Sequence, residues 1–526
     1  MRCIFAFLVL QALVCLRAYS QTPAGDPAGE QLQKFTQIYR YLNRFYVDEV
    51  DNGPLIEGAI EGMLGQLDPH SAYIDAEEMR QVEASVEGEF SGIGIELGML
   101  RDTAIVVGII AGSPAQRAGV LPGDRIVRID TLDAARIARG EMPEHLRGKR
   151  GSRVGIDIVR RGVQEPLHFD IKRDKIPLRT VDAAYMADNG IGYIKVNRFG
   201  RTTMTDFRHA YDELETPERL ILDLRGNSGG LLQEAIELAG FFLPRGARIV
   251  STEGRAVKNM VYEAPADGPA RRCKLVVLID EKSASASEIV AGAIQDWDRG
   301  VVLGRTSFGK GLVQRQVRLP DGSAIRITVA RYRTPSGRII QRPYENGKRR
   351  EYYLDHLRNH PQTTDSIRTA PAYRTLHSGR PVYGDGGIRP DIVIAADTAG
   401  YTPYYAALLR SGAIDEYAID RMERERGVME ASYPTEELFI REYPVDDTML
   451  YELAEAGARQ GVDFDESGFV RAAPRMRTDL KALLARYLFG AEAYYRVVNT
   501  SADRTYGQAL AILDDWENLG RPILEP

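Results

Sequence analysis

Cysteine and histidine are scarce in this sequence of 526 residues, which holds three of the first and seven of the second. Two cysteines, Cys3 and Cys15, fall within the first fifteen residues, so Cys273 has no partner in the rest of the chain. A disulfide framework is therefore excluded. None of the seven histidines lies between residues 210 and 355, and that stretch cannot supply the base of a Ser-His-Asp triad.

The sequence also lacks an excess of positive charge. It has 68 Lys and Arg against 74 Asp and Glu, for a net charge of −6, and the basic residues are spread along the chain. This argues against a dedicated nucleic-acid binder and against a polybasic membrane-surface protein. No HExxH or CxxC motif is present, and the glycine-rich segment 225–230 has no phosphate-binding lysine. The sequence therefore calls for no metal and no other cofactor.

Only one long apolar run is present, and it lies at the N-terminus. Residues 3–16 are apolar except for Gln11, which is about half the length of a membrane span. Ala18 and Ser20 place small residues where a signal peptidase requires them. We expect residues 1–20 to be a signal peptide, and the mature protein to be exported, periplasmic or otherwise extracytoplasmic, without a transmembrane span.

Two other interpretations of this run remain open. A lipid anchor on Cys15 would keep the protein at the membrane, but Val14 stands where a small residue is expected. The run could instead form a buried N-terminal helix.

The spacing of apolar residues divides the rest of the chain into segments. Residues 31–82 have apolar residues every three or four positions, as in helices, whereas residues 86–173 alternate with period two, as in strands. Residues 176–397 alternate between strand and helix, which predicts a mainly parallel sheet covered by helices. Within them, 341–382 is polar, irregular and interpreted as an insertion. Residues 399–526 are predicted to be a helical C-terminal extension, most clearly amphipathic over 479–498.

The strand-rich part opens with a glycine-interrupted segment, Ser91-Gly92-Ile93-Gly94. Taken alone, this segment is typical of a bulged strand. A short helix with Ser113 as N-cap and Gly119 after its end follows, and then a turn at 121–124. Together these features resemble a PDZ domain, whose opening loop binds a peptide carboxylate and whose next strand pairs with the peptide.

A run of small residues, 283–287, lies between an apolar strand and a helix. One interpretation is a capping box, with Ser285 as N-cap and Glu288 three residues later. The other is a nucleophile at a strand-to-helix turn, where the N–H of Ala286 would face a developing oxyanion. The residues alone do not choose among Ser283, Ser285 and Ser287.

A serine nucleophile needs a base, and the candidate here is Lys310, which lies between two glycines. If the chain is extended there, Lys310 and Gln314 share a face, and Gln314 could orient the amine. A lysine that acts as base near neutral pH needs its pKa lowered by roughly 3 units, which requires an apolar pocket. The alternative is an ordinary lysine in a surface turn.

Seven segments in a fixed order resemble those of the C-terminal processing peptidases, or tail-specific proteases. These are serine peptidases with a PDZ domain inserted before a crotonase- or ClpP-like α/β core. The segments are 62–71, 90–94, 223–230, 283–293, 308–314, 333–338 and 387–391. The resemblance covers about residues 31–397, whereas 345–382 and 399–526 match no part of the core family.

The resemblance implies the site. Ser285 would be the nucleophile, because the family places its lysine 25 residues after it, with Lys310 as general base and Gln314 as the residue that positions the lysine. The oxyanion hole would be the backbone N–H of Ala286 and of the glycine pair, with Gly230 favoured over Gly229. Ser91, Gly92, Ile93 and Gly94 would bind the peptide carboxylate.

The implied activity is endopeptidase cleavage in the tail of proteins or peptides with free C-termini. A homo-oligomer or a regulatory adaptor fits the same family, and nucleic acid does not. Two other classes stay open. A non-catalytic PDZ scaffold on a protease-like core is disfavoured by the intact Ser285, Lys310 and Gln314, and an acyl-CoA enzyme of crotonase type by the export signal and the PDZ segment.

Overall fold

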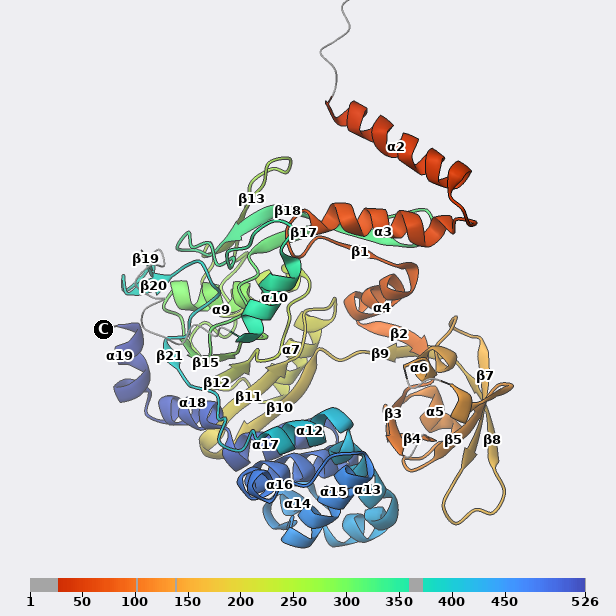
Figure 1. The fold of residues 1–526 in the computed structure, drawn as a ribbon. Coiled ribbons are helices and arrows are strands. Elements are labelled where there is room, and N and C mark those ends of the chain that lie inside the picture. The colour runs from red at the N-terminus through yellow and green to blue at the C-terminus, as the bar shows by residue number, and fades with distance from the viewer. Residues whose placement is uncertain (1–26, 101–102, 138–139, 359–371, 526) are drawn as a thin grey trace, which may run out of the picture. The chain divides into compact units, whose positions relative to one another are not determined.

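The computed structural model describes residues 27–100, 103–137, 140–358 and 372–525 (Figure 1). The predicted signal peptide and residues 359–371 of the predicted insertion lie outside them. The chain divides into two compact units, Met1–Leu67 and Asp68–Pro526. Within the described residues, no helix combines the length and the apolarity that a membrane crossing needs.

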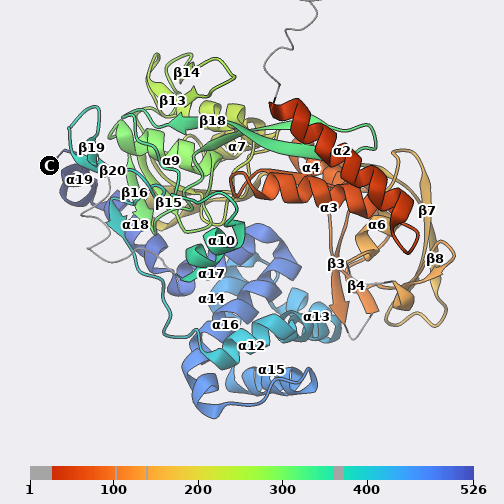
Figure 2. The same cartoon turned by 45° about the horizontal axis from the view of Figure 1, so that its top comes forward.

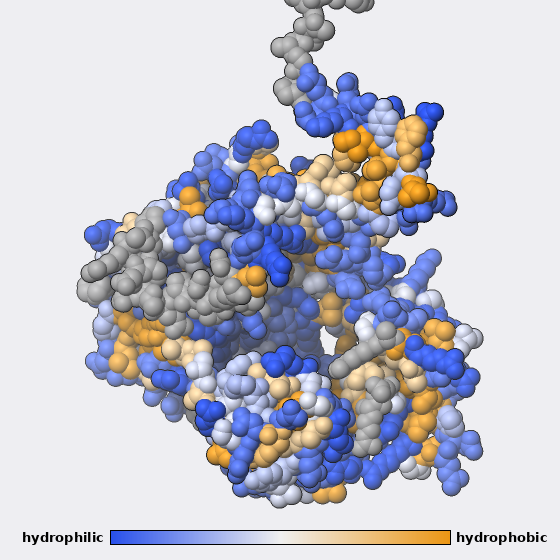
Figure 3. Space-filling model, viewed as in Figure 1, coloured by the Kyte–Doolittle hydropathy of each residue, from blue (hydrophilic) through white to orange (hydrophobic). Residues whose placement is uncertain are grey.

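The first unit contains two helices, α2 (Pro27–Phe45) and α3 (Asn52–Gly65). The carboxylate of Asp51 caps α3 by accepting the N–H of Gly53 at 3.1 Å. The helical prediction for this part is therefore confirmed. Helix α2 exposes a row of large side chains, and orange surface gathers on this part of the molecule in Figure 3. The exposed side chains are Leu32, Phe35, Ile38, Tyr41, Leu42 and Phe45.

The second unit begins with β1 (Ala72–Ile74) and α4 (Ala76–Glu87), and an antiparallel domain follows. Its elements are β2 (Glu89–Gly92), β3 (Ile95–Leu100), β4 (Thr103–Ile109), α5 (Pro114–Ala118), β5 (Arg125–Ile129), β6 (Leu132–Asp133), a 3-10 turn (Ala134–Arg136), α6 (Met142–Leu146), β7 (Arg153–Val159), β8 (Leu167–Lys172) and β9 (Asp174–Pro177). The predicted helix after Ser113 is present, and α6 is an additional helix. In the sheet order β3-β4-β5-β7-β8, strand β3 is an edge.

The core of the unit is a six-stranded sheet in the order β10-β11-β12-β15-β16-β21. Its strands are β10 (Val181–Ala187), β11 (Ile191–Val196), β12 (Arg219–Asp223), β15 (Lys274–Ile279), β16 (Val301–Gly304) and β21 (Ile392–Val393). Only β10 runs antiparallel to its neighbour, so the predicted, mainly parallel sheet is confirmed.

Both faces of this sheet are buried, and side chains alternate between two apolar clusters. On one face, Ile194, Leu222 and Val277 pack against α7 (Thr203–Glu213), α8 (Leu232–Gly240) and α9 (Ala286–Asp296). On the other, Tyr193, Ile221 and Val276 pack against α18 (Arg504–Asp514) and α19 (Arg521–Leu524). The last helices of the chain therefore cover the second face of the sheet, as Figures 1 and 2 show.

A second sheet carries the segment after Lys310. It contains β1, β13 (Arg248–Glu253), β14 (Met260–Glu263), β17 (Leu312–Arg318) and β18 (Ala324–Arg333). Strands β17 and β18 form the predicted hairpin around Asp321 and Gly322.

One of the predictions for the later part of the chain is wrong in detail. The segment 341–382 is not wholly irregular, because it contains α10 (Arg349–Arg358) and the paired strands β19 (Ala372–Arg374) and β20 (Pro381–Tyr383). The amphipathic stretch 479–498 is helical, as predicted, and covers parts of two helices. It is divided at Gly490, which adopts a φ of 103° that favours glycine.

The extension is helical, as predicted. Before α18 and α19 it contains α12 (Pro403–Ser411), α13 (Ala413–Ser432), α14 (Glu436–Glu442), α15 (Asp447–Arg459), α16 (Glu466–Phe489) and α17 (Ala491–Ala502), and a π-helical turn (Trp516–Gly520) follows α18. Helices α12 to α17 enclose an apolar core of their own.

Candidate active site

Ser285 lies at the turn between β15 and α9, as predicted. Its backbone has φ 52° and ψ −108°, a conformation that residues with a side chain rarely adopt and that is held only where the surroundings enforce it. The side chain is half-buried. A serine in this position presents its hydroxyl at the N-terminus of a helix.

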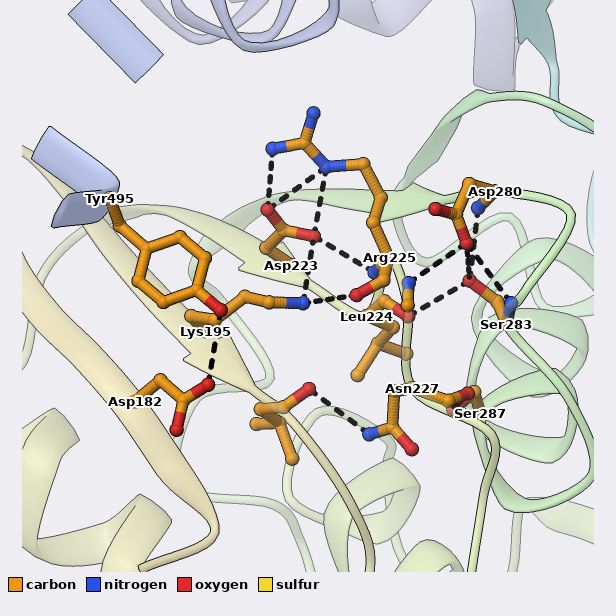
Figure 4. Close-up of polar contacts among 12 residues, drawn as sticks. Asp182, Lys195, Asp223, Leu224, Arg225, Asn227, Asp280, Ser283, Ser287 and Tyr495 are labelled. Carbon is orange, nitrogen blue, oxygen red and sulfur yellow. Dashed lines mark hydrogen bonds and ion pairs between the residues drawn. The ribbon is translucent and has the colours of Figure 1, made fainter. Parts of the chain in front are cut away.

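The neighbouring serines are occupied elsewhere. Ser283 and Ser287 are fully buried, and their hydroxyls donate to the carbonyls of Leu224 at 2.8 Å and Asn227 at 2.9 Å. Figure 4 shows both side chains directed at the loop after β12. Of the three serines that the sequence left open, Ser285 alone is not tied to that loop.

Glu288 joins the Ser285 turn to the Lys310 loop. Its buried carboxylate accepts the backbone N–H of Ser285 at 2.8 Å, of Lys310 at 2.9 Å and of Gly309 at 2.7 Å, and the hydroxyl of Ser307 at 2.5 Å. Burial raises the pKa of this carboxyl. The bond from the Ser285 N–H is the one that the predicted capping box requires. Sequence reasoning missed the other three bonds to this carboxylate.

The Lys310 amine lies in a largely buried environment. Burial, and then the positive charge of Arg326, lower the pKa of Lys310 below the ordinary lysine value, while Glu288 and Asp68 oppose the shift. The hydroxyl of Tyr332 lies 2.8 Å from the carbonyl oxygen of Lys310 and 3.2 Å from that of Ser285. Glu288 and Tyr332 therefore fix the two loops to each other. The structure contains no hydrogen bond between the Ser285 hydroxyl and the Lys310 amine, both of which it describes.

Gln314 is placed differently from the sequence expectation. Strand β17 begins at Leu312, after Lys310, and where its pairing passes from Val313 to Gln314 the partner strand β18 carries one extra residue, Val329. The side-chain amide of Gln314 donates to the backbone carbonyl of His70 at 2.7 Å. Because a carbonyl can only accept, the side-chain oxygen of Gln314 remains its acceptor end.

His70 is a neighbour that sequence reasoning treated only as a remote triad histidine. Burial, and then the charge of Lys310, lower its pKa to about 4. Nδ1 lies 3.3 Å from the Tyr353 hydroxyl, and Nε2 is buried without a hydrogen-bond partner among the described residues. Asp68 accepts the backbone N–H of His70 at 2.9 Å and not the ring. The arrangement is not that of a Ser-His-Asp triad.

The glycine pair contacts the Ser285 turn. A methyl group on Gly229 would lie 2.7 Å from the carbonyl oxygen of Ala284 and 2.9 Å from Cβ of Ser285. The N–H of Gly229 donates to the side chain of Asn227 at 2.9 Å. Those of Gly230 and Ala286 meet no acceptor within the described part of the chain. Two unoccupied N–H groups therefore lie in the two loops that meet at Ser285.

The predicted carboxylate loop, Ser91–Gly94, spans the end of β2 and its connection to β3. Gly94 has φ 81°, and a methyl group on it would lie 2.3 Å from Cβ of Ser113, so only glycine fits there. The carbonyl of Ile93 accepts the N–H of Ala115. The Ser91 hydroxyl is buried without a partner among the described residues. This loop opens directly into the edge strand β3, where an added peptide strand could pair.

Four parts of the chain match known families. Residues 190–345 match the peptidase family S41, 91–172 the PDZ domain, and 15–78 the N-terminal domain of the activating protease CtpB. Residues 404–490 match a family of unknown function, DUF8443.

Named relatives match about three fifths of the chain. A carboxy-terminal-processing protease of Bartonella bacilliformis is 40% identical over 319 residues, which cover 59% of this chain and 73% of that protein. Carboxy-terminal processing protease CtpB of Bacillus subtilis is 38% identical and covers 61% and 67%. Among solved structures, a photosystem II D1 C-terminal processing protease is 28% identical with a TM-score of 0.33, covering 58% of this chain and 83% of that one.

Proposed function

Because this chain belongs to the carboxy-terminal processing proteases of peptidase family S41, which are serine-type peptidases, we propose that it cleaves protein tails with a Ser285-Lys310 dyad. The Ser285 hydroxyl attacks the scissile carbonyl, and Lys310 takes the hydroxyl proton and passes it to the leaving amine. Water then hydrolyses the acyl-enzyme, with Lys310 again as the base. No cofactor takes part in this sequence of steps.

The observation that carries this proposal is the environment of Lys310. Its side chain is half-buried and its pKa is lowered, so that more of the amine is neutral, as a general base must be. Glu288 and Tyr332 connect its loop to the Ser285 turn. The dyad hydrogen bond would form when substrate binds, since catalytic hydrogen bonds often tighten only in the substrate complex.

Three further groups complete the proposed site. The free N–H groups of Gly230 and Ala286 would bind the oxyanion, and Gly229 is disfavoured because Asn227 occupies its N–H. Gln314 would position Lys310 through its side-chain oxygen, which its bond to His70 leaves available. These assignments agree with the requirement that oxyanion donors be fixed in place before the reaction.

We assign substrate recognition to the PDZ domain. The domain binds peptides, and the loop Ser91–Gly94 would take the free C-terminal carboxylate while the tail pairs with β3. Export through the N-terminal signal would place the reaction outside the cytoplasm.

Paired variants test the dyad. We expect Ser285→Ala and Lys310→Met to lower kcat for an unfolded protein substrate by roughly 10³-fold or more. Lys282→Met, at an exposed lysine of the same turn, should leave it unchanged. A fluorophosphonate should label the wild type and not Ser285→Ala. A wild type that binds tail peptides without cleaving or reacting would instead support the non-catalytic scaffold.

A further inference from the structure

The C-terminal extension contacts the loop that leads to the proposed oxyanion hole. Asp503 lies in the turn between α17 and α18, and its two carboxylate oxygens have different partners. Oδ1 caps α18 by accepting the N–H groups of Thr505 at 2.9 Å and Tyr506 at 3.0 Å. Oδ2 accepts Nη1 of Arg225. One side chain therefore fixes a helix of the extension and an arginine of the catalytic core.

Asn499, on α17, adds a second link to the same arginine. Its side-chain oxygen lies 3.5 Å from Nη2 of Arg225, and its amide donates to the Tyr185 hydroxyl on β10 at 2.8 Å. The contacts border a cavity of about 810 Å³ between the sheet and the extension. Since Asp503 faces this cavity, a smaller or neutral side chain there would not disturb a packed interior.

Arg225 in turn fixes the end of β12, as Figure 4 shows. Its guanidinium donates to the carboxylate of Asp223 at 2.6 and 3.0 Å, and its carbonyl accepts the amine of Lys195. Burial alone would raise the pKa of Asp223, but Arg225 and Lys195 hold it well below its ordinary value. Asp223 is therefore a carboxylate, and it pairs with both cations at the end of the strand.

The loop from Arg225 to Gly230 is short and is held at each step. The N–H of Gly226 donates to Asp280 at 2.9 Å, and Asn227 donates to the carbonyl of Val196 at 3.0 Å. Ser228 and then the glycine pair follow. The backbone of Arg225 anchors the start of this loop, because its N–H donates to Asp223 at 2.9 Å and its carbonyl accepts the amine of Lys195.

We propose that Asp503 is a positioning residue for the oxyanion loop, acting through Arg225, and that Asn499 assists it. The inference rests on the proposed function, because it needs Gly230 to be an oxyanion donor. By this account the extension is part of the catalytic apparatus. It holds the loop in the orientation that binds the transition state and does not touch the substrate.

Asp503→Asn tests the proposal with the helix cap retained, because asparagine caps as well as aspartate. The amide removes the charge that pairs with Arg225. A misplaced oxyanion donor weakens only the transition state, so we expect kcat to fall roughly 10- to 100-fold with KM within about twofold. Binding of a peptide boronate, whose tetrahedral adduct on Ser285 uses the oxyanion hole, should weaken by a similar factor.

Asp514→Asn is the matched control. Asp514 lies on the same helix α18 and also pairs with a core arginine, Arg219, at 3.3 Å, but this pair is remote from the loop. It should leave kcat, KM and boronate affinity unchanged. Asp503→Ser, which also caps α18 but cannot reach Arg225, should reproduce the effect of Asp503→Asn if the latter does not fold.

The possible outcomes distinguish a failure of this inference from a failure of the proposed function on which it rests. A wild type that cleaves and is labelled by a fluorophosphonate, with wild-type kcat in both folded Asp503 variants, would overturn the inference alone. Equal losses in the Asp503 and Asp514 variants would also overturn it, because the effect would then be general loosening. A wild type that neither cleaves nor reacts would overturn both.

Discussion

His70 is a neutral histidine inside the site, since its pKa of about 4 lies far below neutral pH. In the unfolded chain a histidine titrates near 6.5. Between these two values the unfolded state binds a proton that the folded state does not. The stability that the neutral ring provides is therefore complete above pH 6.5 and is lost as the pH falls toward 4.

His70→Gln should remove this dependence. We expect the free energy of unfolding of the wild type to fall between pH 6.5 and 4 by on the order of 3 kcal/mol more than that of the variant. Denaturant titrations at a series of pH values measure the difference. Parallel curves for the two proteins would mean that His70 is protonated in the folded chain.

Glu288 shows the limit of local sequence reasoning at the residue scale. The spacing from Ser285 predicts one bond, a capping box, and that bond is present. The other three donors come from Ser307, Gly309 and Lys310, which follow β16, the parallel neighbour of β15 in the sheet. Nothing at positions 285–288 indicates them, because they depend on tertiary contacts.

At the scale of elements, β3 is where a bound tail would add a strand. We expect full-length Ser285→Ala to bind a tail peptide with a free carboxylate at least about tenfold more tightly than the same peptide with a C-terminal amide. Fluorescence anisotropy with the two labelled peptides measures this. Equal affinities would exclude carboxylate capture by the loop before β3.

Gly94→Ala provides a protein-side control for that experiment. Its methyl group would meet Cβ of Ser113 and would require a disfavoured φ. The free-acid peptide should lose its advantage over the amide in this background.

Elements with strong local signals could be predicted, and those set by distant partners could not. The caps at Ser113 and Gly119 define α5, and short apolar runs define β11, β12 and β15. The register shift after Val313 has no local signal, because pairing with β18 creates it. The end of a helix at Gly490 could not be predicted either, because the only local signal is one glycine within a long amphipathic pattern.

At the scale of the catalytic unit, the sheet depends on helices far away in the sequence. Ile512 of α18 is fully buried against strands that are separated from it by some two hundred to three hundred residues. The sequence predicted helices in the extension, but not that two of them would form a layer of the core. The spacing of apolar residues shows which face of a helix is buried, but it does not show which other element that face packs against.

Ile512→Ala should lower the free energy of unfolding of the catalytic unit by about 2–5 kcal/mol, since it leaves a cavity under the sheet. Leu519→Ala, at a side chain that is 42% exposed, should cost less than about 1 kcal/mol. Chemical denaturation, followed by hydrogen exchange of the backbone amides in β12 and β15, measures the loss of stability in each of the two variants. Equal and small effects would mean that the extension folds independently of the core.

The position of α18 and α19 also sets an order of events during synthesis. Chains emerge from the ribosome N-terminus first, and a sheet with one bare apolar face is not a stable end point. Because residues up to Leu524 cover that face, the core cannot complete its fold until α18 and α19 have been made. The serine, the lysine and the glycine loop are all synthesised long before the layer that stabilises them, so proteolytic activity should arise only after these two helices have been synthesised.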